Sequence, residues 1–92
     1  MTPDATWSRA AATDLDEIVA YVAARDPDAA DRLRDRVLGK TAALRGRTGL
    51  YRRGRVNGTR EMVVHRNYVV VYAVRNGQPF ILRVLHAARR WP

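Results

Sequence analysis

The first half of the chain has the 3.6-residue apolar period of two helices. In the first, apolar residues recur at i, i+3, i+4 and i+7: Leu15, Ile18, Val19 and Val22. Ser8 is the expected N-cap of this helix. Asp26 as a cap and Pro27 at the first helical position predict the start of the second helix. Because only one or two residues separate the two helices, we expect an antiparallel hairpin.

The second half of the chain changes to strand-like composition. Three segments rich in β-branched and aromatic residues follow one another, TREMVVH, NYVVVYAV and FILRVLH, with the turn RNGQP between the last two. Residues 5–7 are a candidate edge strand, and a further short strand is expected near Tyr51. The expected fold class is α+β. A helical hairpin packs on a three- to four-stranded antiparallel sheet, in one domain of residues 1–92.

The predicted strands are apolar on both faces. Residues 69–74 and 80–82 leave no polar face, although an antiparallel sheet with one face in water alternates apolar and polar residues. Two helices cover one face only. We therefore expect the second face to expose an apolar patch that binds a partner or a second copy. Strand parity places Ile81, Arg83 and Leu85 on that second face and His86 on the other.

Composition excludes several kinds of site. The chain has no cysteine and only two histidines, which excludes a disulfide framework and a thiolate zinc site, and we expect neither a metal nor a cofactor. No apolar stretch approaches the roughly 20 residues that span a bilayer, and the first ten residues lack a signal-peptide pattern. The expected location is the cytoplasm, without a membrane partner.

Charge divides the chain into two unequal halves. Residues 1–44 carry eight acidic and six basic side chains, whereas residues 45–92 carry eleven basic ones and a single acid, Glu61. The net charge of +8 therefore lies almost wholly in the second half. Such a surface attracts nucleic acid, a nucleoprotein machine or an acidic protein, and a solvated arginine-rich face is the alternative interpretation.

Four segments together resemble one known family. They are DLDEIVAYVAARDPDAADRL, GRVNGTREMVV, YVVVYAV and ILRVLHAARRWP. In this order and spacing they are similar to the toxins of the RelE/ParE superfamily of bacterial type II toxin–antitoxin modules, over nearly the whole chain. The resemblance implies a helical hairpin on an antiparallel sheet. It also implies a mostly acidic cognate antitoxin that wraps around the toxin and neutralises it.

The superfamily contains two activities. RelE-like members cleave messenger RNA in the ribosome, whereas ParE-like members act on DNA gyrase and stall it on cut DNA. The segments NGTREMVV and LHAARRWP look more like the ParE branch. Ribonuclease members often carry an arginine three positions before the strand tyrosine, and Val69 stands there in this chain. The leading hypothesis is a ParE-like gyrase inhibitor, and a RelE-like endoribonuclease is the alternative.

The candidate site residues follow from charge and position. The ribonuclease alternative would use Arg60, Glu61 and His86 as catalytic groups. The residues expected to bind the target are Arg83, His86, Arg89, Arg90 and Trp91, and those expected to bind the antitoxin are Ile81, Arg83 and Leu85.

Several of these residues also have structural interpretations. His86 can cap the strand end through a hydrogen bond, and Glu61 can hold an arginine in a salt bridge. Trp91 can anchor the C-terminal segment on the fold.

Overall fold

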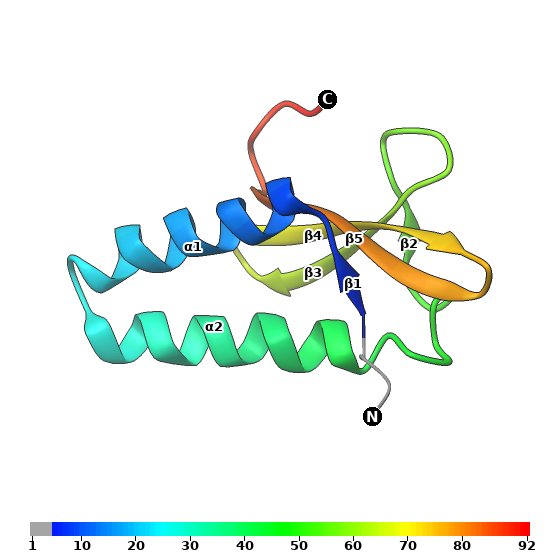
Figure 1. The fold of residues 1–92 in the computed structure, drawn as a ribbon. Coiled ribbons are helices and arrows are strands. Elements are labelled where there is room, and N and C mark those ends of the chain that lie inside the picture. Colours follow the sequence, from blue (N-terminus) through cyan, green and yellow to red (C-terminus); the bar gives the residue numbers. More distant parts are fainter. Residues whose placement is uncertain (1–4) are drawn as a thin grey trace.

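Two helices lie against one face of a five-stranded sheet (Figure 1). The protein is described by a computed structural model that covers residues 5–92. The elements are β1 (Thr6–Trp7), α1 (Arg9–Ala23), α2 (Pro27–Ala42), β2 (Arg52–Arg53), β3 (Arg60–His65), β4 (Tyr68–Arg75) and β5 (Gln78–His86). The strand order is β1-β5-β4-β3-β2. The α+β prediction is confirmed, and two-residue strands at both edges raise the strand count to five.

The helices begin where the sequence predicts. The Ser8 hydroxyl accepts a hydrogen bond from the Ala11 N–H at 3.0 Å and donates one to the carbonyl of Leu82 at 2.9 Å, so it caps α1 and ties it to β5. The Asp26 carboxylate accepts from the Ala29 N–H at 3.0 Å and caps α2. Of the described helices, neither has both the length and the apolar character needed to cross a membrane.

Strands β3, β4 and β5 form the predicted antiparallel meander. The β4–β5 turn uses Asn76 and Gly77, both with positive φ (51° and 76°), as a two-residue hairpin of this kind requires. Strand β1 was expected only as a candidate edge strand. It pairs with β5 in parallel, with Thr6 opposite Phe80, and the chain enters α1 soon after it.

The main core lies between the helices and the sheet. Helix α1 packs along β5, and α2 packs on β3. The core residues of the helices are Ala11, Leu15, Leu33 and Val37, and those of the sheet are Met62, Val64, Val70, Tyr72, Ile81 and Val84. The predicted stripe of α1 is confirmed, since Ile18, Val19 and Val22 pack against this core beside Leu15.

A bulge in β5 overturns the parity prediction for this strand. Val71 lies opposite Arg83 and Tyr72 lies opposite Ile81, so Leu82 is an extra residue on the β5 side. The extra residue turns Ile81 toward the helices, where it is 0% exposed. The prediction that Ile81 shares a face with Arg83 and Leu85 is therefore wrong, because a bulge reverses the alternation of side chains along the strand.

The second face of the sheet is covered by the chain itself. Val69, Val71 and Leu85 form a small second core, each at most 2% exposed, and Trp91 packs against them. The predicted open apolar patch is thus wrong over these residues, because the C-terminal segment folds back onto them. Val63, opposite Val69 on the same face, keeps 47% of its surface exposed.

Candidate functional site

The C-terminal segment, residues 86–92, leaves β5 through a tight turn. The Ala87 N–H donates to the carbonyl of Asn67 at 2.7 Å, and the Arg89 N–H donates to the carbonyl of His86 at 2.9 Å. The Ala88 N–H donates to Nδ1 of His86 at 3.1 Å. These bonds redirect the backbone at the end of the strand, and the segment then brings Trp91 onto the second core.

An arginine from a distant loop holds this segment in place. Arg55 donates through Nη1 to the carbonyl of Arg89 at 2.9 Å. The same guanidinium donates through Nε and Nη2 to the two carboxylate oxygens of Glu61, at 2.9 and 3.0 Å. Glu61 thereby orients the Arg55 side chain, which in turn holds the C-terminal segment through the carbonyl of Arg89. The loop residue Arg55 was not predicted as part of the site, because nothing in the sequence shows where its loop folds.

Glu61 is a structural carboxylate with four donors. It also accepts the Arg55 backbone N–H at 2.9 Å and Nη2 of Arg52 at 3.4 Å, and its side chain is 4% exposed. The hydrogen bonds from Arg55, followed by nearby positive charge, lower the pKa of Glu61 from 4.5 to about 2 despite burial, which acts in the opposite direction. Such a group is a poor general base near neutral pH.

The structure separates Glu61 from His86. Glu61 lies opposite Val71 and shares the second face of the sheet, whereas His86 follows Leu85 in β5 and points to the helix face. The imidazole is exposed and lies edge-on to Tyr68, with 5.7 Å between ring centroids. The two groups therefore do not form an acid–base pair. Arg60, the third catalytic candidate, donates to the carbonyl of Tyr51 at 2.6 Å.

Some of the predicted target-binding residues meet in one hollow. His86 and Arg89 line a cavity of about 480 Å³ together with Tyr21 and Tyr68. Arg90 is exposed to solvent. Trp91 lies on the opposite face of the sheet and packs on the second core, which matches its structural interpretation as an anchor and places it apart from His86.

Arg83 is held at the edge of the sheet. Its Nε and Nη2 donate to the Asp14 carboxylate of α1 at 2.7 and 2.9 Å. Asp14 also accepts a hydrogen bond from the Val84 N–H at 2.9 Å. The two-residue strand β1 pairs only with Phe80 and Ile81, so this carboxylate takes the place of a strand partner for Val84. The hydrogen bonds to Asp14 raise the pKa of Arg83. The sequence did not predict that Arg83 pairs with Asp14. We call the Asp14 carboxylate with its bonds to Arg83 and Val84 the clamp.

Replacing Asp14 with asparagine is expected to destabilise the fold by about 1.5 kcal/mol, because a charged acceptor of three hydrogen bonds is lost at a partly solvated site. Urea unfolding measures this loss, and the Val84 amide should exchange with solvent faster. The exposed neighbour Asp16, changed to asparagine, provides the control and should stay within about 0.5 kcal/mol. Equal stabilities of the two variants would contradict the clamp.

Comparison with known proteins identifies the family. Residues 5–91 match the family described as ParE toxin of type II toxin–antitoxin system, parDE. A candidate toxin, Y4kP, of Sinorhizobium fredii (strain NBRC 101917 / NGR234) is 38% identical over 87 residues, which cover 94% of this chain and 90% of the relative.

The fold agrees with a solved structure as well. A chain of the chromosomal ParDE TA system from P. aeruginosa superimposes with a TM-score of 0.79 at 24% identity, covering 88% of this chain and 91% of that one. The arrangement of two helices on a mostly antiparallel sheet is thus shared. The chain belongs to the ParE toxin family of type II toxin–antitoxin systems.

Proposed function

We propose that this ParE-family toxin inhibits DNA gyrase by holding the enzyme on cleaved DNA, and that it does so in the cytoplasm as a binding protein. The observation that carries the proposal is the anchored C-terminal segment. Trp91 and the Arg55–Arg89 hydrogen bond hold its backbone, so that Arg89, which shares a hollow with His86, and its neighbour Arg90 are presented to solvent from an anchored segment. A fixed backbone lowers the entropy cost of presenting charged side chains to a target.

The arrangement of the acidic and basic groups favours binding over RNA cleavage. Cleavage through the 2′-hydroxyl needs an acid and a base within reach of one phosphate. Glu61 and His86 lie on opposite faces, and Glu61 is already engaged by arginines. Val69, at the position where ribonuclease members often carry an arginine, is apolar and 2% exposed. These features support the gyrase proposal over the RelE-like alternative.

The proposed antitoxin is acidic and binds the cationic surface. The net charge of +8 favours a negatively charged partner and speeds its association. Of the three residues predicted to contact it, Arg83 has a side chain 24% exposed, whereas Ile81 and Leu85 are 0% and 1% exposed. We therefore propose that Arg83 and the exposed arginines of the second half that lie outside β2 and β3, rather than the two buried aliphatic residues, meet antitoxin carboxylates.

A supercoiling assay with purified gyrase tests the proposed activity. The wild-type chain should inhibit supercoiling and trap a cleaved DNA complex. The double variant Arg89→Gln/Arg90→Gln should inhibit about tenfold less, since charged anchors at an interface centre carry this much binding energy or more. The matched control Arg34→Gln/Arg36→Gln removes two exposed arginines from α2 and should retain inhibition.

Two results would contradict the proposal. One is wild-type protein at excess that leaves supercoiling unchanged and traps no cleaved DNA. The other is the appearance of new 5′ ends in messenger RNA, detected by primer extension after induction, while gyrase remains active. That second outcome would favour the ribosome-dependent endoribonuclease.

A further inference from the structure

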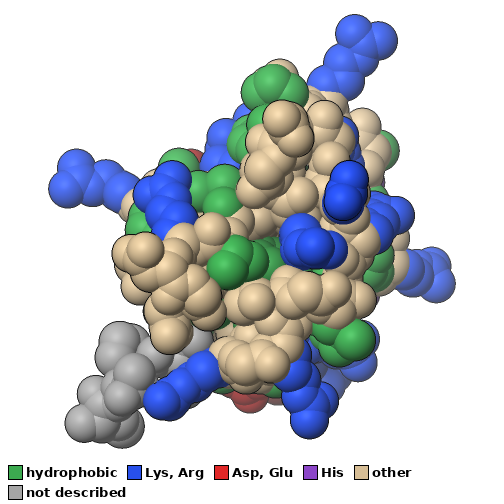
Figure 2. Space-filling model, turned by 90° about the vertical axis from the view of Figure 1, so that its right-hand side faces the viewer, with side chains coloured by type: hydrophobic (Ala, Val, Ile, Leu, Met, Phe, Trp, Pro, Cys, Tyr) green, Lys and Arg blue, Asp and Glu red, His purple; other side chains and the backbone are tan. Residues whose placement is uncertain are grey.

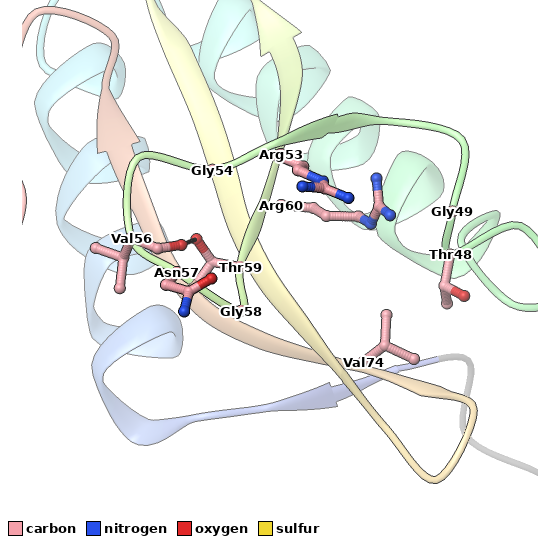
Figure 3. A pocket seen from close by; sticks show the side chains of 10 residues that line it. All are labelled: Thr48, Gly49, Arg53, Gly54, Val56, Asn57, Gly58, Thr59, Arg60 and Val74. Carbon is pink, nitrogen blue, oxygen red and sulfur yellow. Dashed lines mark hydrogen bonds between the residues drawn. The ribbon is translucent and has the colours of Figure 1, made fainter.

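A second hollow lies at the opposite end of β4 from the C-terminal segment. It measures about 580 Å³ and is bounded by the loop after α2, the β2–β3 connection and the end of β4 (Figure 3). Thr48, Asn57 and Val74 contribute to its walls, and Arg53 and Arg60 are its charged residues. None of the described residues that line it is acidic. The C-terminal segment, to which the gyrase contact is assigned above, contributes no residue to this hollow.

The two arginines of the hollow place like charges next to each other. Arg53 of β2 lies directly opposite Arg60 of β3, and like charges so placed in neighbouring strands repel each other. Figure 3 shows the two side chains running next to one another toward Thr48 and Gly49. An anion between or beside the two guanidinium groups would replace this repulsion by attraction.

Most donors of this pair are free to bind a ligand. Arg60 is partly buried and donates through Nη1 to the carbonyl of Tyr51 at 2.6 Å. Within residues 5–92, the structure shows no protein acceptor for its other N–H groups or for the guanidinium of Arg53. On the other face of the same strand pair, Arg52 lies opposite Glu61 and is neutralised by it. Glu61, the single acid of the second half, therefore does not neutralise Arg53 or Arg60.

The wall formed by the β2–β3 connection is closely packed. The Gly54 N–H donates to the carbonyl of Thr59 at 2.8 Å, and the Thr59 N–H donates to the carbonyl of Val56 at 3.1 Å. A Cβ at position 54 would collide with the Thr59 hydroxyl, and Gly58 has a φ of +83°, which only glycine adopts at low cost. These glycines let the loop close tightly, so Arg53 and Arg60 are positioned by a compact frame.

The surface around the hollow is cationic as well. Figure 2 views the end of the molecule that carries the β4–β5 turn and β2, and Lys and Arg side chains project around it, with acidic side chains only at its margin. The extended surface suits a polyanion, because several further phosphates along a strand would meet positive charge.

We propose that this hollow binds a backbone phosphate of nucleic acid, with Arg53 and Arg60 each donating to one of the non-bridging oxygens. The two oxygens of a carboxylate lie in one plane and can both be bound by a single guanidinium group, as Arg55 binds Glu61. A phosphodiester carries its two oxygens on a tetrahedral centre, and it continues into neighbouring phosphates that meet the surrounding charge. The site is independent of which enzyme the toxin inhibits.

Fluorescence anisotropy with a labelled oligonucleotide, single-stranded and duplex, tests this site in the absence of gyrase. The full-length Arg53→Gln/Arg60→Gln variant should bind about tenfold more weakly. For this variant the plot of log K against log salt should be less steep than for wild type by about 0.7 to 0.9, the value for one phosphate contact. The control Arg9→Gln/Arg34→Gln removes the same charge from exposed positions on the helices and should bind with nearly the wild-type affinity.

Further arms separate the sources of the effect. Inorganic phosphate should compete with the oligonucleotide on the wild type only, and a Glu-rich peptide of matched charge should bind all variants alike. Because Arg60 bonds to Tyr51, the single variant Arg53→Gln serves as a check that keeps this bond, with an unchanged melting temperature and about threefold weaker binding.

Three outcomes would overturn the proposal. They are equal losses in the hollow variant and the helix control, peptide binding that depends on Arg53 and Arg60, and phosphate binding without any effect on the oligonucleotide. A failure to inhibit gyrase, by contrast, leaves this result unaffected, so the two proposals fail separately.

Discussion

Changing Glu61 to glutamine is expected to lower the free energy of unfolding by about 3 kcal/mol, because it removes the buried carboxylate from its ion pair with Arg55. The carboxylate accepts four hydrogen bonds from Arg55 and Arg52, and a glutamine side chain offers one oxygen and sets an NH₂ group against these donors. Urea unfolding followed by circular dichroism measures the change. Glu17, an exposed glutamate of α1, gives the matched control, and its change to glutamine should cost less than about 0.5 kcal/mol.

The same carboxylate makes stability depend on pH. The pKa of Glu61 is about 2 in the folded chain, below the ordinary value of 4.5, so protonation favours the unfolded state. Its contribution is complete above pH 4.5 and is lost as the pH falls from 4.5 toward 2. The gap in unfolding free energy between wild type and Glu61→Gln should therefore narrow over this interval. A gap that stays constant would show that the carboxylate is not held in its ionised form.

Replacing Trp91 with alanine should weaken gyrase inhibition about as strongly as removing Arg89 and Arg90, roughly tenfold. Trp91 packs on Val69, Val71 and Leu85, and its loss releases the segment that carries the two arginines. Stability should fall by about 2 kcal/mol, less than for a fully buried tryptophan because Trp91 is only partly buried. Supercoiling assays and urea unfolding on the same preparations measure both effects.

The conservative variant Trp91→Phe separates anchoring from direct contact. Phenylalanine still covers the second core, so it should keep most of the stability and most of the inhibition. If Trp91→Ala lost stability but inhibited gyrase fully, the fixed geometry of the segment would be irrelevant to activity. Arg89→Gln/Arg90→Gln should show the reverse pattern, with weak inhibition and unchanged unfolding, because both side chains are exposed.

Local rules were sufficient for the helices and the meander. Ser8 and Asp26 cap their helices through bonds made within one turn, and the Asn76–Gly77 turn follows from the φ angles that these residue types tolerate. The family resemblance rested on the same segments, and the match over residues 5–91 confirms it. Where neighbours in sequence determine the structure, the sequence was enough.

Features that depend on distant parts of the chain were not predictable in this way. The bulge at Leu82 reversed the orientation of Ile81, and a single extra residue leaves no mark in an apolar run. The covering of Leu85 by Trp91 depends on the turn after His86 and on Arg55 from a loop more than thirty residues earlier in the chain. The charge count showed that Glu61 is the only acidic residue of the second half. Which arginines donate to it, Arg52 and Arg55, depends on how the loop between β2 and β3 folds.

The position of β5 between β1 and β4 has a consequence for synthesis of the toxin. Ser8 and Asp14 are synthesised early, and their hydrogen-bond partners in β5, Leu82, Arg83 and Val84, leave the ribosome about seventy residues later. Translation that aborts before β5 yields a product that lacks the pairings of β5 with β1 and β4 and the bonds between Asp14 and Arg83, so it cannot complete this fold.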